Sequence, residues 1–253
     1  LMVRNIPTKS IGCEHVVYNY PPKVFQALRK WFYPKLNAVV VLNQQEQENF
    51  YFLKNTIVIP NSLPFNNTQK AQLDAKNIIT VGRLTHEKGV DMLIDIYQKI
   101  APEIPDWTLN IYGVGEDLAS LQEQIRAQNL EEYIKLKGLS KNISESYLQS
   151  SIFVLGSRSE SFGIVIIEAM NHGLPVISFD ADGPKNIITD NENGFLIQQF
   201  DQELFSKKLL SLIKDKEKRN VMGDKAYASS LAYQEEKIIP IWNQQLQAIR
   251  KTR

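Results

Sequence analysis

Short apolar runs alternate with amphipathic stretches through most of the chain, and this alternation limits the fold more than any other feature of the sequence. The apolar runs from residue 77 onward are 78–81, 109–112, 134–136, 152–155, 176–179 and 195–197. Between the first two, Val90, Leu93, Ile94, Tyr97 and Ile100 recur at the spacing of one helix face. Strands alternating with helices predict an α/β fold, a doubly wound parallel sheet with helices on both faces.

The loops that follow the predicted strands are expected to meet at one edge of the sheet. In parallel sheets, ligands bind at the carboxyl ends of the strands. These loops are 82–88, 113–116, 138–140 and 157–163. We therefore expect a binding site along this edge.

The chain is predicted to divide into unequal parts. Residues 1–60 hold too few strands and helices for an α/β domain of about 150 residues, so they are interpreted as the remnant of an N-terminal domain. The polar stretch 61–76 is predicted to be a hinge. Residues 77–230 are then the main C-terminal domain, and 231–253 a C-terminal crossover helix. The start at Leu1 rather than Met is what a fragment would show.

Composition argues against several classes of protein. The formal net charge is +1, which gives no field for gathering nucleic acid, so nucleic acid is not an expected partner. The single cysteine, Cys13, excludes an internal disulfide and favours a reducing compartment; we expect it to be small and buried. No apolar run approaches the ~18 residues that cross a bilayer. A cytoplasmic protein is expected.

The segment 157–169 carries the most chemical information. It follows a predicted strand and begins a helix near Gly163, and the free amides and dipole of a helix start suit a phosphate. Glu168 lies one turn after Ile164 and can accept two hydrogen bonds from a diol such as a ribose. Glu160, ahead of the helix, can reach the other end of a ligand. Spacing alone leaves open a capping carboxylate and a solvent-facing glutamate.

A second candidate element is the turn after the strand at 78–81. Arg83 and Lys88 flank this turn and can neutralise a diphosphate, the first as a bidentate fork and the second as a point charge. Read alone, Arg83 and Lys88 fit a solvated basic pair beside a helix start better than a binding site. Both elements fall on the same predicted sheet edge, which favours a shared site.

Together these segments resemble the retaining glycosyltransferases of family 4. Residues 81–89 are similar to the family's GRL-x-x-EKG turn, and Glu160 and Glu168 match its two glutamates separated by seven residues. Further similar segments follow in order at 59–61, 112–116, 137–138, 173–176, 183–184 and 193–196. The resemblance extends from about Cys13 to Gln245.

The resemblance implies a GT-B fold of two facing Rossmann-like domains, in which the second holds most of a nucleotide-diphosphate sugar. It implies transfer with retention, no metal or other cofactor, a UDP-sugar as the commonest donor, and a bacterial polysaccharide or glycolipid as acceptor. Arg83 and Lys88 would bind the diphosphate, Glu168 the ribose, and Glu160 the hydroxyls of the donor sugar. The remaining implied donor-binding positions are Gly82, Gly138, Leu139, Ser161, Phe162, Gly163, Ile164 and Val165.

The histidines and a pair of aspartates are separated by context. His15 resembles the histidine that these enzymes place beside the donor sugar, so it joins Glu160 as a candidate catalytic residue; the alternative is a satisfied histidine at a domain edge. His172 at a helix end is interpreted as structural, and His86 as incidental. Asp180 and Asp182 have the spacing of a metal motif but are interpreted as turn residues.

Residues 23–35 interleave lysine and arginine with aromatic side chains, which is the composition of a helix on an anionic membrane. A peripheral position on the cytoplasmic face of a membrane is therefore a second expectation for location. The alternative is an interdomain helix whose aromatic residues are buried.

Other functions remain open from the sequence. Because the first domain is represented only in part, the chain alone is expected to bind a donor without transferring it. The alternatives to a transferase are a donor-binding or interaction module, or an epimerase or hydrolase of the same fold that acts on a UDP-sugar.

Overall fold

The computed structural model describes residues 9–19, 21–65, 67 and 69–251, which form two compact units. The first unit combines the residues up to Leu63 with those from Tyr233 onward, and the second comprises Pro64–Ala232. The division after Leu63 falls inside the segment predicted as a hinge. Each unit is described by itself.

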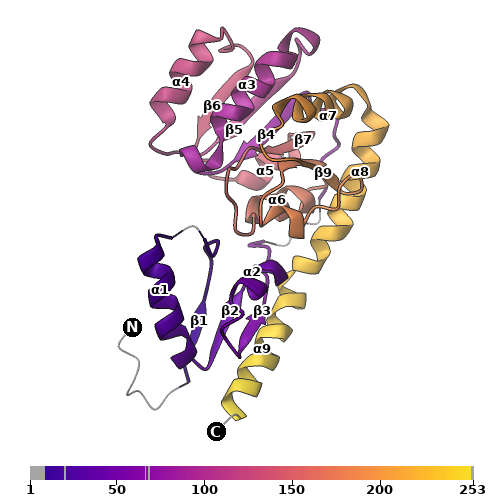
Figure 1. The fold of residues 1–253 in the computed structure, drawn as a ribbon. Helices are drawn as coiled ribbons and strands as arrows, with labels where there is room; N and C mark the ends of the chain where they lie inside the picture. The colour runs from indigo at the N-terminus through magenta and orange to yellow at the C-terminus, as the bar shows by residue number, and fades with distance from the viewer. Residues whose placement is uncertain (1–8, 20, 66, 68, 252–253) are drawn as a thin grey trace. The chain divides into compact units, whose positions relative to one another are not determined.

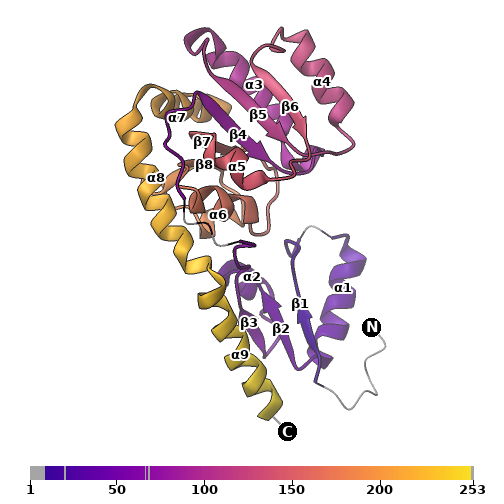
Figure 2. The same cartoon turned by 180° about the vertical axis from the view of Figure 1, so that it is seen from behind.

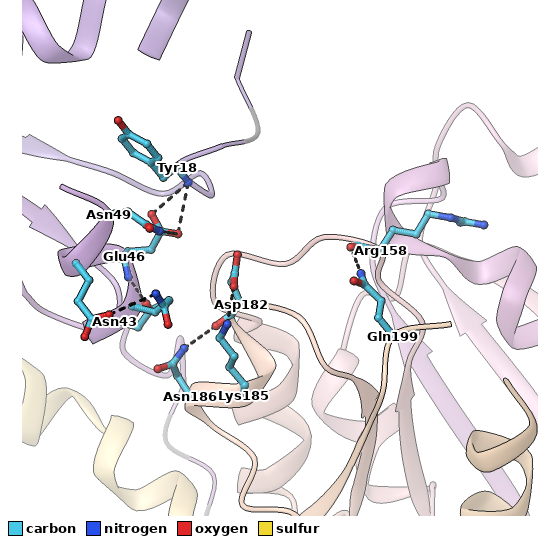
Figure 3. Close-up of polar contacts among 11 residues, drawn as sticks. Tyr18, Asn43, Glu46, Asn49, Arg158, Asp182, Lys185, Asn186 and Gln199 are labelled. Carbon is cyan, nitrogen blue, oxygen red and sulfur yellow. Dashed lines mark hydrogen bonds and ion pairs between the residues drawn. The ribbon is translucent and has the colours of Figure 1, made fainter. Parts of the chain in front are cut away.

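The first unit is built on a parallel sheet of three strands in the order β1-β2-β3 (Figure 1). The strands are β1 (Ile11–Cys13), β2 (Ala38–Val41) and β3 (Thr56–Val58), and the helices are α1 (Lys23–Phe32), α2 (Gln44–Asn49) and α9 (Glu235–Lys251). Asn43 caps α2, because its side chain accepts a hydrogen bond of 2.8 Å from the amide of Glu46 (Figure 3).

The middle strand of this sheet is buried on both faces. Val40 packs with Ile238 of α9 on one face, while Val39 and Val41 pack with Phe50 on the other. This alternation follows from the period of two along a strand. Helix α9, which lies far along the chain, therefore supplies one wall of the first unit's core. It begins at Glu235, so Pro240 lies inside the helix rather than at its start.

The second unit is a six-stranded parallel sheet in the order β6-β5-β4-β7-β8-β9. Its strands are β4 (Asn77–Val81), β5 (Thr108–Tyr112), β6 (Ile134–Gly138), β7 (Ile152–Leu155), β8 (Val176–Phe179) and β9 (Gly194–Ile197). Its helices are α3 (Val90–Ile100), α4 (Leu118–Ala127), α5 (Ile143–Leu148), α6 (Ile164–Asn171), α7 (Gln202–Lys214) and α8 (Lys216–Ser230). Every apolar run predicted as a strand in this part of the chain lies in one, so the predicted α/β class is confirmed.

Helices cover both faces of this sheet (Figure 2). Side chains of α3, α4 and α7 share one apolar cluster with the strands, and Tyr147 of α5 contacts Phe153 of β7. Strands β7 and β8 are buried throughout, as expected when both faces of a parallel sheet are covered.

The direction in which strands are added reverses beside β4. From β4 the chain adds β5 and β6 on one side, and it then returns to add β7, β8 and β9 on the other. Ligands in such sheets bind at this reversal, beyond the carboxyl ends of the strands. The loops after β4 and β7 flank that point, and they are the loops that carry the predicted site.

No helix among the described residues combines the length and the apolar character needed to cross a membrane.

Candidate functional site

The loop after β4 is fixed by a close contact with the loop after β7. Gly89 has φ +61°, and a Cβ at this position would lie inside van der Waals contact of the carbonyl oxygen of Gly156. Only glycine meets both conditions. The contact ends the short 3-10 turn His86–Lys88 and begins α3, so it fixes where Lys88 lies relative to the loop of residues 156–163.

The loop after β7 leads into α6 through Gly163, which has φ +93°. Among the described residues, no side chain makes a capping hydrogen bond at the amino end of α6. The amide of Ile166 donates to the carbonyl oxygen of Gly163. The amides of Ile164 and Val165 and the positive end of the helix dipole are left to face an anion. Phe162 is buried just before them and anchors the loop.

Arg83, Glu168 and the glycine loops surround one cavity of about 340 Å³. Of the predicted site residues, those that line it are Gly82, Arg83, Gly138, Leu139, Val165 and Glu168. Additional lining comes from Tyr112, Val114 and Ile143. The cavity thus lies at the carboxyl ends of β4, β5 and β6 and reaches one face of α6.

Lys88 and Glu160 do not line this cavity but pair with each other. Their Nζ and Oε2 atoms are 2.8 Å apart, and the side chains are 17% and 12% exposed. Because the pair is largely shielded from water, the attraction between its two charges is screened less than in a typical surface ion pair. Two side chains predicted to contact different parts of a ligand are therefore linked directly.

Glu168 lies on the cavity wall with its carboxylate partly withdrawn from water. The buried hydroxyl of Tyr147 donates a hydrogen bond of 2.9 Å to Oε2 of Glu168. Burial raises the pKa of Glu168, and the hydrogen bond from Tyr147 partly opposes that rise. Sequence reasoning missed Tyr147, because one tyrosine in the short, serine-rich segment Ile143–Leu148 gives no sign of the residue to which its hydroxyl donates.

Arg158 is a second residue that the sequence did not single out. Its guanidinium donates to both carboxylate oxygens of Asp91, at 2.8 and 2.6 Å, and to the carbonyl oxygen of His86 at 2.6 Å. The side-chain amide of Gln199 donates a hydrogen bond of 2.6 Å to the backbone carbonyl oxygen of Arg158 (Figure 3). We name the ion pair of Arg158 with Asp91 the Arg158–Asp91 clamp, because it joins the loop after β7 to the first turn of α3, which directly follows the turn that holds Lys88. Burial opposes ionisation of Asp91, but the hydrogen bonds and charge of Arg158 hold the pKa of Asp91 below its usual value.

The histidines lie in different settings. His172 is fully buried, and its ring nitrogens lie 2.6 Å from the hydroxyl of Ser144 and 2.7 Å from the carbonyl oxygen of Glu168. Burial lowers the pKa of His172, so it is a neutral structural residue. His86 is exposed in the turn before Lys88. His15 belongs to the first unit, where it is exposed and lines a cavity of about 160 Å³ together with Trp242.

The acidic loop after β8 makes contacts within itself. Asp182 pairs with Lys185 at 2.7 Å, and the amide group of Asn186 donates to the carbonyl oxygen of Asp182 at 2.5 Å (Figure 3). Asp180 is exposed. The contacts of Asp182 agree with its interpretation as a turn residue.

Two side chains in the first unit differ from expectation. Cys13 is exposed, not buried, because it ends a strand that pairs with only one other described strand. Arg29, grouped above with the surface cations, is only 8% exposed: it pairs with the buried Glu14 at 2.8 Å. Tyr33 also donates to Glu14, so this carboxylate draws both side chains inward.

The chain is similar in sequence to known glycosyltransferases. Residues 65–229 match the family model of the glycosyl transferases group 1. The chain is 32% identical over 249 residues to the amylovoran biosynthesis glycosyltransferase AmsD of Erwinia amylovora, covering 94% of this chain and 70% of AmsD. It is 35% identical over 251 residues to an uncharacterized glycosyltransferase of Haemophilus influenzae, covering 96% of this chain and 70% of that protein.

A solved structure shows the same fold. TarM of S. aureus, crystallised with fondaparinux, α-GlcNAc-glycerol and UDP, superposes with a TM-score of 0.84 at 24% identity. The match covers 93% of this chain and half of the TarM chain. The GT-B type of α/β fold expected from the sequence is therefore confirmed.

Proposed function

Because the chain belongs to the glycosyl transferases of group 1, we propose that it holds the donor site of a retaining, metal-independent enzyme that uses a UDP-sugar. The acceptor is a bacterial surface polysaccharide or glycolipid. The single observation that carries this proposal is the cavity of about 340 Å³, where Arg83 and Glu168 face one space beside the uncapped start of α6. The similarity to AmsD, named for amylovoran biosynthesis, supports the acceptor class.

The described groups match the parts of such a donor. In this proposal the uracil lies against the loop at Gly138 and Leu139, and the ribose hydroxyls donate to Glu168. Arg83 and the first amides of α6 bind the diphosphate. Developing charge on the leaving diphosphate would be stabilised by these groups, in the role that a metal ion has in other enzymes.

In this proposal, the Lys88–Glu160 pair contacts the donor sugar and the diphosphate. Lys88 would share its charge between Glu160 and the diphosphate, while Glu160 would keep one oxygen for a hydroxyl of the sugar. Holding Glu160 by a largely buried cation before the donor arrives reduces the reorganisation that binding requires. His15 remains a candidate catalytic residue of the first unit.

Calorimetry with UDP and several UDP-sugars, in the presence of either EDTA or Mg²⁺, tests the donor site. We expect micromolar-class binding that EDTA does not abolish. Absence of UDP binding, or binding only with Mg²⁺, would contradict the donor and metal proposals respectively.

A transfer assay then separates the possible activities. Transfer from the UDP-sugar to a polysaccharide or lipid-linked acceptor, with the anomeric configuration read by NMR, supports a retaining transferase. Donor binding by this chain, together with no transfer by the full-length protein, would instead indicate a donor-binding module. Turnover of UDP-N-acetylglucosamine without any acceptor would indicate an epimerase or hydrolase.

We also propose that residues 23–35 contact an anionic membrane. Phe25 and Trp31 are 55% and 65% exposed on α1, and Lys23, Lys30 and Lys35 are exposed in the same segment. Aromatic side chains beside lysines suit the interface of an anionic bilayer. Arg29 takes no part, since it pairs with Glu14 inside the unit.

Sedimentation with vesicles tests this contact. Replacing Lys23, Lys30 and Lys35 by serine should reduce binding to phosphatidylserine vesicles by roughly a hundredfold, at about 1 kcal/mol for each lysine. The matched control replaces Lys99, Lys225 and Lys237, which are exposed elsewhere, and should bind more strongly than the first variant. Equal binding of the unchanged chain to anionic and neutral vesicles would refute the proposal.

A further inference from the structure

Tyr147 is a buried polar side chain for which the proposed function gives no role. It lies on α5 with no exposed surface, and its ring contacts Phe153 of β7 and His172 after α6, with centroids 6.2 and 5.0 Å away. Packing on both sides fixes the ring, and therefore fixes where the hydroxyl points.

The Tyr147 hydroxyl is directed at one oxygen of Glu168. The distance to Oε2 is 2.9 Å, and within the described part of the chain Tyr147 is the one side chain that donates to this carboxylate. Burial raises the pKa of Tyr147 well above its usual value, so the hydroxyl keeps its proton and donates at neutral pH. With one oxygen held, the rotation of the carboxylate about its last bond is restricted.

A second set of contacts holds α5 against α6. His172 bridges Ser144 of α5 and the carbonyl oxygen of Glu168 in α6. Because burial keeps His172 neutral, one ring nitrogen donates and the other accepts. The backbone and the side chain of Glu168 are thus both tied to α5.

We propose that Tyr147 is a positioning residue for the nucleotide: it holds Oε2 of Glu168 so that the carboxylate presents its other oxygen to a cis-diol of the ligand. This inference rests on the proposed role of Glu168 in binding the ribose. It makes recognition of the two ribose hydroxyls depend on a residue that touches no part of the ligand.

The test compares UDP with 2′,3′-dideoxy-UDP by calorimetry on the full 253-residue chain. The unchanged chain should prefer UDP by about tenfold or more, as expected when hydrogen bonds to a charged group are lost. Tyr147→Phe, which removes only the hydroxyl, should reduce this preference to about twofold. Affinity for the dideoxy analogue should stay the same.

A matched control is available in the same unit. Tyr97 is also a buried tyrosine, and its hydroxyl donates to the carbonyl oxygen of Trp107, just before the amino end of β5. Tyr97→Phe should lower the melting temperature as Tyr147→Phe does, while leaving the preference for UDP unchanged.

The pH dependence provides a readout that loss of packing would not move. Around Glu168, Tyr147 comes from α5, His172 follows α6, and Arg83 and Tyr112 come from the strand ends that line the cavity. Removing the Tyr147 hydroxyl removes a bond that lowers the pKa of Glu168. As the solution is acidified, the preference for UDP should therefore disappear at a higher pH in Tyr147→Phe than in the unchanged chain.

The outcomes separate the two claims. If the unchanged chain binds both nucleotides equally, the ribose role of Glu168 fails, and this inference fails with it. If the unchanged chain prefers UDP and Tyr147→Phe keeps both the preference and its pH midpoint, the ribose role stands and the positioning role is wrong. A loss of preference in Tyr97→Phe as well would also overturn the positioning role, because general destabilisation would then explain the result.

Discussion

Glu168 combines partial burial with one side-chain donor, Tyr147, among the described residues, an arrangement that suits a ligand able to donate the remaining bonds. We expect Glu168→Ala to weaken UDP binding by about 1–3 kcal/mol, the usual loss for hydrogen bonds to a charged group. Calorimetry measures the change. Glu132→Ala, at a glutamate that is 91% exposed on the same unit, is the control. Equal UDP affinity in both variants would refute the ribose assignment.

Lys88 should act on the diphosphate and on Glu160 together. Lys88→Ala leaves a carboxylate that is 12% exposed without its cation, so we expect a loss of about 1–3 kcal/mol in folding free energy. UDP affinity should fall while uridine affinity does not, because only UDP carries the diphosphate. Lys88→Arg, which keeps the charge, should recover most of the stability. A parallel loss of uridine affinity would contradict the assignment.

At the scale of residues, the sequence predicted which side chains belong to the candidate site but not which groups they contact. The spacing of two motifs after predicted strands singled out four side chains: Glu160, Glu168, Arg83 and Lys88. Tyr147 and Arg158 were not singled out, since each meets its partner only through the packing of separate loops: Arg158 lies 67 positions from Asp91. Arg29 was placed with the surface lysines by composition, and only the buried Glu14 explains why it turns inward.

At the scale of elements, the Arg158–Asp91 clamp ties the loop after β7 to the first turn of α3. The pKa of Asp91 is lowered in the folded state. A lowered carboxyl pKa adds stability that is present above the unfolded pKa and is lost as the pH falls through the folded value. We therefore expect Asp91→Asn to be less stable than the unchanged chain near pH 7, by about 1 kcal/mol or less because the pair is partly exposed.

Thermal unfolding between pH 7 and pH 3 checks this expectation. The difference between the two proteins should shrink as the pH falls below about 4, where the unfolded carboxyl is protonated. A difference that stays constant with pH would show that Asp91 contributes by packing rather than by charge.

Elements were predicted better than contacts between elements. Continuous apolar runs such as 152–155 and 176–179 identify strands covered on both faces, and β7 and β8 occupy those residues. The strand order β6-β5-β4-β7-β8-β9 became known only from the structure, because apolar spacing contains no information about which strands are neighbours. The meeting of the candidate loops at one edge followed from the parallel class alone.

For the whole molecule, the two units have separate cores, and α9 belongs to the first. We expect Ile238→Asp to destabilise the first unit by roughly 3 kcal/mol or more, because it places a charge among Val40 and Ile59. Hydrogen exchange at β2 and β3 should accelerate. The cavity around Glu168 is lined by the second unit alone, so UDP affinity should be unchanged.

An equal rise in exchange across β4 and β7, or a loss of UDP binding, would contradict this separation. Trp242→Ala is a milder second variant, since Trp242 packs against the same cluster from its edge.

The contact between Gly89 and Gly156 also has a consequence for engineering donor choice. The two loops meet backbone to backbone and leave no room for a side chain at Gly89 or Gly156, so substitution at either glycine would mostly yield misfolded protein. Substitutions are instead accommodated at Val114 and Leu139, which are exposed and line the cavity. A combinatorial library restricted to those rim positions would alter what the cavity accepts while the frame that holds it stays constant.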